Sequence, residues 1–242
     1  MPQDCENANN IPYLSTSHVI HQREVIFENE RIIIEDYKQQ DDPNEEAKVL
    51  RQMIFPDKPT QIQSEVPLMY RNSKSSELQA HHKTQSALMP KKKQKEVVFD
   101  RENLTYECHH AMIAGLCLTA DKLCAQIKNA DLDKKLNILV LGTGTGILPM
   151  FLSQHFSKYL EKITTVEIDA GVLIAGRDHF GFHTENEPLI DSVCADAFEW
   201  VLSSGDEGKY DMIFVDINYE EADSKVSPPL KFFSSEFIGK LV

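Results

Sequence analysis

The sequence predicts an α/β fold in which helices cover both faces of a parallel sheet, preceded by a small N-terminal β-hairpin region. From residue 104 onward, short apolar strands alternate with segments of helical periodicity, and repeated β-α units of this kind build parallel sheets. Before residue 71, strand-like runs come in pairs joined by turn residues, a pattern typical of hairpins. These patterns divide the chain into a β-strand region at 1–70, a polar, lysine-containing linker at 71–100 and an α/β domain at 101–242.

The composition favours a folded protein outside the membrane. Of the 242 residues, 41% are hydrophobic, and 25 Lys and Arg stand against 38 Asp and Glu, which gives a net charge of −13. No apolar run approaches the roughly 20 residues that cross a bilayer, and we expect no secretory signal. The acidic balance disfavours nucleic-acid binding, which needs a positive surface. The five scattered cysteines form no C-x-x-C pair, so we expect reduced thiols, a cytoplasmic location and no metal site.

The N-terminal region predicts two strand pairs. Residues 23–37 are two apolar runs around a turn at 28–30, and the runs at 49–55 and 61–68 are joined by a proline-containing turn. The polar stretch that follows contains the basic run Pro90–Lys95, which fits either a nuclear-import or nucleic-acid patch or, as we favour, a solvated linker.

The predicted elements of the α/β domain follow one another without an internal repeat. They are a helix over 109–124, strand 137–141, helix 147–155, strand 163–168, helix 171–180, strand 188–194, a short helix through Trp200, strand 212–217 and a last helix over 232–241.

A glycine-rich turn joins the first of these strands to its helix. Gly142, Gly144 and Gly146 form a G-x-G-x-G sequence, and glycine permits both a sharp turn and the close approach of a ligand to the backbone. The N–H groups and the helix dipole then favour a negative group. The third glycine comes one residue too early for the dinucleotide pattern, because position 147 is Ile. A plain strand-to-helix turn is the alternative interpretation.

Acidic residues follow the next three strands of this domain. Glu167 can accept hydrogen bonds from both hydroxyls of a ribose, or it is a surface acid. Asp196 can accept the exocyclic amine of an adenine, cap the following helix, or do both. Asp216 faces the crevice where open α/β sheets bind ligands. The four motifs, each at the end of a strand, together predict a nucleoside site.

These motifs resemble the seven-strand S-adenosylmethionine-dependent methyltransferases, in the branch close to spermidine synthase. The resemblance rests on the runs 142–146, 166–169, 195–197 and 211–216. It implies a Rossmann-like class I methyltransferase sheet and S-adenosylmethionine as the cofactor. The residues that it assigns to cofactor binding are Gly142, Thr143, Gly144, Gly146, Glu167, Ile168, Asp196 and Ala197.

A narrower resemblance extends from about residue 20 to the end of the chain. Residues 63–65, 109–116, 180–182 and 227–230, together with the lysine-rich stretch, are similar to the C-terminal half of the elongation factor 1-alpha lysine and N-terminal methyltransferases. This resemblance implies a protein N-methyltransferase that acts on an N-terminal α-amine or a lysine of elongation factor 1-alpha.

Two departures from these families leave alternatives open. The run 216–219 lacks the second acid with which spermidine synthases hold a diamine, which disfavours a polyamine synthase. The sequence also ends one helix after the fourth strand, whereas the fold normally adds strands five to seven. We therefore expect an incomplete sheet of strands one to four, and a truncated module that binds a cofactor or partner without catalysis is the second alternative.

The expected chemistry is transfer of a methyl group to a neutral amine. An α-amine has a pKa of about 7.7–8.0, against about 10.4 for lysine, so no strong base is required. Asp216 is the candidate that orients the amine or accepts its proton through water. Tyr106, His109 and His110 precede or begin the first helix and are candidates for the substrate side, although such residues also cap or pack helices.

Overall fold

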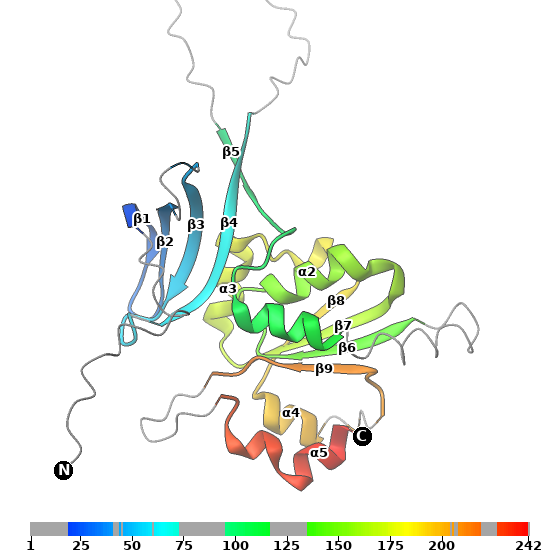
Figure 1. Cartoon of the computed structure of the whole chain (residues 1–242). Helices are drawn as coiled ribbons and strands as arrows, with labels where there is room; N and C mark the ends of the chain where they lie inside the picture. The colour runs from blue at the N-terminus through cyan, green and yellow to red at the C-terminus, as the bar shows by residue number, and fades with distance from the viewer. Residues whose placement is uncertain are drawn as a thin grey trace, which may run out of the picture.

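The chain forms two β-sheets of different kinds (Figure 1). The computed structural model describes residues 19–40, 44, 46–59, 61–72, 95–116, 135–203, 205, 208–218 and 227–241. One sheet has five antiparallel strands in sequence order, and the other has four parallel strands. The second sheet and its helices form a Rossmann-like α/β unit, as the sequence predicts.

The antiparallel sheet contains both predicted hairpins. Its strands are β1 (Val19–Glu28), β2 (Ile33–Gln40), β3 (Lys48–Ile54), β4 (Ile62–Asn72) and β5 (Lys95–Phe99). The side chain of Asn29 closes the β1–β2 turn, where its Oδ1 accepts the backbone N–H groups of Arg31 and Ile32, each at 2.8 Å. Strand β5 lies within the segment expected to be a polar linker, and it pairs with the far end of β4.

The parallel sheet has the strand order β8-β7-β6-β9. Its strands are β6 (Leu136–Leu141), β7 (Leu160–Glu167), β8 (Ile190–Cys194) and β9 (Met212–Val215). The chain moves outward from β6 to β8 and then returns to the other side of β6 for β9. Such a reversal is a topological switch point, where the carboxyl ends of strands border a crevice.

Helices cover both faces of the parallel sheet. They are α2 (Ile147–Phe156), α3 (Ala170–Phe180), α4 (Ala197–Ser203) and α5 (Ser235–Leu241), with 3-10 turns at Ser157–Tyr159, Thr184–Asn186 and Leu230–Phe233. A further helix begins at residue 107, and the structure describes it to residue 116. The last predicted helix, over 232–241, is therefore a 3-10 turn followed by a separate α-helix.

Strand β6 shows how the two faces are filled. Ile138 and Val140 pack into the core beneath α2 and α3, whereas Leu139 and Leu141 pack against α4 and α5 on the other face. All four side chains are buried. Alternation along the strand thus supplies two separate apolar layers, which a parallel sheet covered on both faces requires.

The antiparallel sheet shares the first of these cores. Ile34, Met53 and Val66 belong to the same buried cluster as Ile138 and Leu148 of the α/β unit. A buried polar contact reinforces the junction.

Arg51 of β3 forms that contact. It binds both carboxylate oxygens of Asp36, at 2.7 and 2.9 Å, and donates to the carbonyl of His179 in α3 at 2.8 Å. The two sheets are therefore packed as one body.

Some expectations fall on residues that the structure does not describe. These are most of the linker, the start of the basic run Pro90–Lys95 and the second half of the helix predicted over 109–124. Among the residues that are described, no helix is both long and apolar enough to span a membrane.

Candidate functional site

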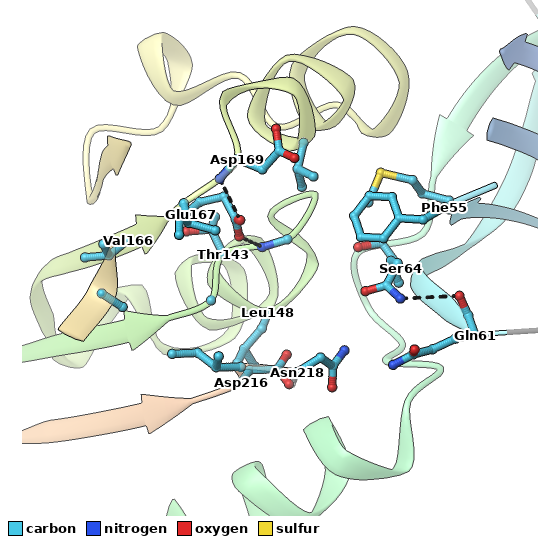
Figure 2. Close-up of a pocket in the computed structure, with 18 of the residues that line it drawn as sticks. Phe55, Gln61, Ser64, Thr143, Leu148, Val166, Glu167, Asp169, Asp216 and Asn218 are labelled. Atoms are coloured by element: carbon cyan, nitrogen blue, oxygen red, sulfur yellow. Dashed lines mark hydrogen bonds between the residues drawn. The ribbon is translucent and has the colours of Figure 1, made fainter. Parts of the chain in front are cut away.

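A cavity of about 1140 Å³ lies between the carboxyl edge of the parallel sheet and the antiparallel sheet (Figure 2). Its position at the switch point between β6 and β9 is the one that the strand order predicts. The predicted site residues that line it are Tyr106, His109, Gly142, Thr143, Gly144, Glu167, Ile168, Asp196, Ala197 and Asp216. Gly146 and His110 do not line it.

The glycine turn after β6 has the backbone conformation that its sequence predicts. The φ angles of Gly142, Gly144 and Gly146 are 86°, 54° and 89°, a region that side chains disfavour. The space beside two of these glycines is filled by protein atoms. A Cβ at Gly142 would lie 2.0 Å from the carbonyl oxygen of Asp216, and one at Gly146 would lie 2.2 Å from the ring of Phe182. At these two positions glycine permits close packing of the fold. The expectation that glycine is needed there to let a ligand approach the backbone is wrong.

Glu167 is half-buried at the end of β7 and points toward the glycine turn (Figure 2). Its Oε2 accepts the N–H of Gly144 at 2.9 Å, and its Oε1 accepts the N–H of Asp169 at 3.1 Å. Burial raises the pKa of this carboxyl, and the two N–H groups oppose that shift. Because each carboxylate oxygen has a second lone pair, Glu167 can still accept two further hydrogen bonds from a ligand. Ile168, which is 67% exposed, adds an apolar surface beside it.

Asp196 caps α4 and also lines the cavity. Its Oδ1 accepts the N–H of Phe198 at 2.7 Å, while its Oδ2 lies 3.7 Å from Nζ of Lys231. Lys231 lies over the rings of Phe198 and Phe232, at 4.9 and 5.4 Å from their centroids. The capping interpretation is confirmed, and the second oxygen takes no part in the cap. No pattern in the sequence singled out Lys231, which lies in the 3-10 turn after β9.

Asp216, at the end of β9, is held by a histidine. Its Oδ2 lies 2.8 Å from Nε2 of His109, whose side chain is buried. The hydroxyl of Tyr106 is also buried, and neither this hydroxyl nor Nδ1 of His109 has a hydrogen-bond partner among the described residues. Burial is the main cause that raises the pKa of Tyr106, so its hydroxyl stays neutral. His110 is exposed and lies apart from this group.

The opposite wall of the cavity comes from the β3–β4 hairpin (Figure 2). Phe55, Gln61, Gln63 and Ser64 face the glycine turn, and Oγ of Ser64 accepts the N–H of Thr145 at 3.2 Å. None of these residues was predicted to belong to the site. The one hint in the sequence was the run 63–65, which resembles the elongation factor 1-alpha methyltransferases. That resemblance assigned no function to these residues.

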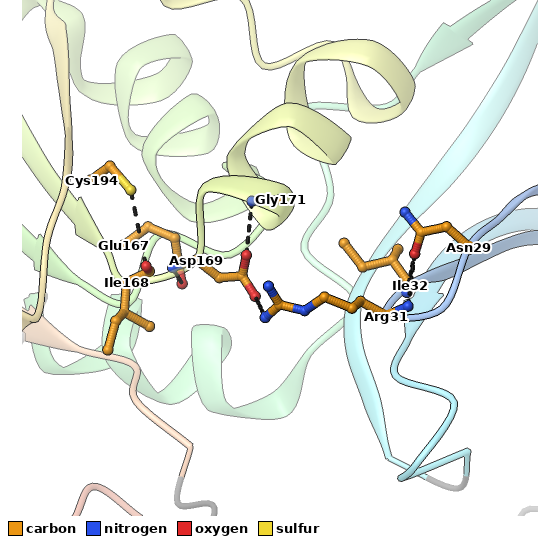
Figure 3. Close-up of polar contacts among 8 residues, drawn as sticks. All are labelled: Asn29, Arg31, Ile32, Glu167, Ile168, Asp169, Gly171 and Cys194. Atoms are coloured by element: carbon orange, nitrogen blue, oxygen red, sulfur yellow. Dashed lines mark hydrogen bonds and ion pairs between the residues drawn. The ribbon is translucent and has the colours of Figure 1, made fainter.

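The β1–β2 turn contacts the start of α3 through Arg31 and Asp169 (Figure 3). Arg31 forms an ion pair with Oδ2 of Asp169, and Oδ1 of Asp169 caps α3 through the N–H of Gly171 at 2.8 Å. Both Arg31 and Asp169 line the cavity. Asp169 thus caps α3 with one oxygen, and its second oxygen ties the antiparallel sheet to the edge that carries Glu167.

Comparison with known proteins identifies relatives along almost the whole chain. No family model matches. The eEF1A lysine and N-terminal methyltransferase of Mus musculus is 29% identical over 248 residues, and that of Homo sapiens is 28% identical over 250 residues. Each alignment covers 96% of this chain and 33% of the relative, so the chain spans about a third of the length of the relatives it matches.

Two solved structures are also similar to this chain. A crystal structure of human methyltransferase-like protein 13 in complex with SAH is 32% identical, with a TM-score of 0.45, over 56% of this chain and 58% of that one. A probable spermidine synthase from Corynebacterium glutamicum is 17% identical, with a TM-score of 0.48, over 88% of this chain and 57% of that one. The protein is thus a Rossmann-like α/β chain that is similar, over 96% of its sequence, to one third of the eEF1A lysine and N-terminal methyltransferases.

Proposed function

We propose that this protein is an S-adenosylmethionine-dependent methyltransferase that acts on an amine of elongation factor 1-alpha, either its N-terminal α-amine or a lysine. The observation that carries the proposal is that Glu167, Asp196 and Asp216, which follow three different strands, all line one cavity. Proteins similar to this chain over nearly its whole length are named for this activity. We further propose that it acts in the cytoplasm, where the free thiols of Cys108 and Cys194 stay reduced.

The cavity suits the cofactor in size and in the kinds of group that line it. Glu167 has lone pairs for the two ribose hydroxyls, and Ile168 offers an apolar surface for the base. Asp196 can accept the exocyclic amine of adenine with Oδ2, because its Oδ1 is already used by the cap of α4. Gly142, Thr143 and Gly144 border the remaining space, where the methionine moiety would lie.

The amine would bind beside Asp216. A carboxylate only accepts hydrogen bonds, so Nε2 of His109 carries the proton shared with Oδ2, and this bond fixes the carboxylate. Oδ1 is then available for an N–H of the amine. The neutral hydroxyl of Tyr106 is a second acceptor, and its lack of a partner within the described chain fits a group that meets the substrate.

The cofactor, when bound, supplies an electrophilic methyl group on a sulfonium. The chain's own residues align the amine with that methyl and exclude water. An α-amine is partly neutral near pH 7.5, since its pKa is about 7.7–8.0, whereas a lysine with a pKa of about 10.4 needs more assistance. Asp216 can receive the proton directly or through water after the amine becomes bonded to carbon. The site therefore suits a terminal amine better than an unassisted lysine.

Radiolabelled cofactor and recombinant elongation factor 1-alpha test the proposal. We expect label to appear on the factor with the wild-type chain and to fall by about 100-fold or more with Asp216→Asn, which removes the acceptor charge. Lys162→Gln is a control that should leave transfer unchanged, because Lys162 pairs with Asp191 near the start of β7 and does not line the cavity. The proposed activity is refuted if no label is transferred by a protein that contains this chain and is as long as the relatives.

Two alternatives have distinct outcomes. A cofactor-binding module without catalysis would bind S-adenosylhomocysteine in a calorimetric titration and transfer nothing. A polyamine synthase would convert putrescine in the presence of the decarboxylated cofactor, but the run 216–219 lacks the second acid with which those enzymes hold a diamine. We therefore expect no aminopropyl transfer.

A further inference from the structure

We infer that Cys108, His109 and Asp216 form a binding site for a divalent metal ion of the zinc class, and that this ion inhibits the enzyme by occupying Asp216. The metal-binding half of the inference concerns these three side chains alone. The inhibitory half rests on the proposed function.

The three side chains converge on one point of the cavity wall. One ligand atom from each, the Cys108 sulfur, a His109 nitrogen and an Asp216 oxygen, lies within 4.8 Å of the other two, and all three residues line the cavity. Around tetrahedral zinc, with bonds of about 2.0–2.3 Å, neighbouring ligand atoms are roughly 3.5 Å apart. Cys108 is exposed, so its side chain can rotate to close the remaining gap.

The ligand set selects the class of metal. A thiolate, an imidazole and a carboxylate are the ligands that zinc takes, whereas magnesium and calcium need several oxygen atoms. Three protein ligands leave a fourth position open toward the cavity, which water or a substrate amine could fill. Magnesium is therefore the appropriate negative control.

The charges around the three side chains favour a dication. The Cys108 sulfur, once deprotonated, and the Asp216 carboxylate place two negative charges within 4.8 Å of each other, and a dication between them removes their repulsion. On binding, the thiol releases its proton to water. The proton on Nε2 moves to Nδ1, the nitrogen that has no partner among the described residues, and Nε2 then binds the ion.

Metal binding would remove the group on which the substrate depends. The ion replaces the hydrogen bond from His109 and neutralises the carboxylate, so Asp216 becomes a much weaker acceptor for the N–H and the proton of an amine. An amine that fills the open fourth position has its lone pair on the ion and cannot attack the methyl group. Zinc should thus inhibit methyl transfer, and a chelator should restore it.

Cobalt(II) is the probe for the site, since it replaces zinc and gives an absorption band when a thiolate binds it. We expect one cobalt per chain, with a thiolate band that zinc abolishes and magnesium leaves unchanged. Cys108→Ser should remove the band and weaken zinc binding about tenfold or more, since the loss of groups that only orient metal ligands already costs roughly 10–100-fold. Cys194→Ser is the matched control, because this exposed, free cysteine lies outside the group.

A variant that keeps Cys108 and replaces Cys5, Cys117, Cys124 and Cys194 by serine separates this site from the other thiols. Retention of the cobalt band in that variant supports the inference. Absence of the band there, or its persistence in Cys108→Ser, overturns it.

The inhibitory half is measured as the zinc concentration that halves methyl transfer, relative to each variant's own rate without metal. We expect Cys108→Ser to raise that concentration about tenfold or more. An equal concentration for wild type and Cys108→Ser would overturn the inhibitory half. If the chain transfers no methyl group at all, the proposed function fails, whereas the cobalt titration still decides whether the metal site exists.

Discussion

Nε2 of His109 lies 2.8 Å from Oδ2 of Asp216, although 107 residues separate them in the sequence. The contact brings the start of the helix at 107–116 to the carboxyl end of β9. It restricts the carboxylate to one orientation and leaves its second oxygen directed at the cavity. His109, which the sequence placed on the substrate side, is thereby also a positioning residue for Asp216, the proposed proton acceptor.

Replacement of His109 should lower catalysis more than stability if this role is correct. Leucine at position 109 removes the donor to Asp216, so we expect kcat to fall about tenfold or more, because a misplaced acceptor loses most of its benefit. Glutamine at position 109 places an amide N–H near the position of Nε2 and should recover part of the rate. Kinetics with labelled cofactor, beside urea unfolding of each variant, measure both effects. Equal rates for the leucine and glutamine variants would contradict the positioning role.

Alanine at Gly146 should destabilise the fold by about 2–4 kcal/mol. The new Cβ would overlap the ring of Phe182, and the φ of 89° adds strain of about 1–2 kcal/mol for a residue with a side chain. Gly208→Ala is the control for strain alone, because its φ is 65° and nothing lies near the position of its Cβ. Chemical unfolding of both variants measures the difference, and equal losses would show that the ring imposes no steric cost.

Arg51 should be one of the more costly residues to replace in the antiparallel sheet. Methionine at position 51 leaves the carboxylate of Asp36 largely buried without its partner, so we expect a loss of about 3–5 kcal/mol. The double variant Arg51→Met and Asp36→Leu should recover much of that loss, because it removes the isolated charge. Replacement of the exposed Arg177, which pairs with Asp178, is the comparison and should change the unfolding free energy little. Unfolding by urea distinguishes these outcomes.

Asp196 combines two roles that substitutions can separate. Serine retains an oxygen that caps α4 but lacks the second acceptor, so we expect near-native stability and weaker binding of S-adenosylhomocysteine, by about tenfold. Alanine should weaken binding as well and also cost about 1 kcal/mol of stability, because the cap is lost. Calorimetric titration and thermal unfolding report the two effects independently. Unchanged binding in Asp196→Ser would remove this carboxylate from the cofactor site.

The buried carboxyl of Glu167 should make stability depend on pH. Burial raises its pKa in the folded state above the ordinary value of 4.5, so the folded chain holds this proton more tightly than the unfolded chain. Its contribution to the unfolding free energy is therefore complete below pH 4.5 and is lost as the pH rises through the raised folded pKa. We expect Glu167→Gln to lose this dependence. Urea titrations of both proteins between about pH 4 and 7 give the comparison, and parallel curves would contradict it.

The sequence predicted the α/β unit and many of the residues that line the cavity, because both depend on local patterns. Apolar runs of strand length and helical spacing define the elements, and the carboxyl ends of parallel strands share an edge. Glu167, Asp196 and Asp216 could therefore be expected to meet before their contacts were known. Gly146 was placed in the same group, but it lies behind the turn and contacts Phe182 instead.

The parts that could not be predicted depend on distant packing. Strand β5 begins with Lys95 and Glu96, which read as a polar linker until the edge of β4 pairs with them. Phe55 and Ser64 enter the site only because the antiparallel sheet packs on α2 and α3. The proton donor to Asp216 likewise depends on where a helix starts relative to a strand far along the chain. No local periodicity encodes such distances.

The apolar core common to both sheets has a consequence for how the cavity can admit a large protein. If the antiparallel sheet rotated away from the α/β unit, Ile34, Met53 and Val66 would lose their apolar contacts with that unit and become exposed to water. Rotation of rim side chains, such as Arg31 and Lys231, is far less costly. If the proposed function is correct, a protein substrate therefore enters by a narrow free end or a protruding side chain, while its folded body remains outside the cavity.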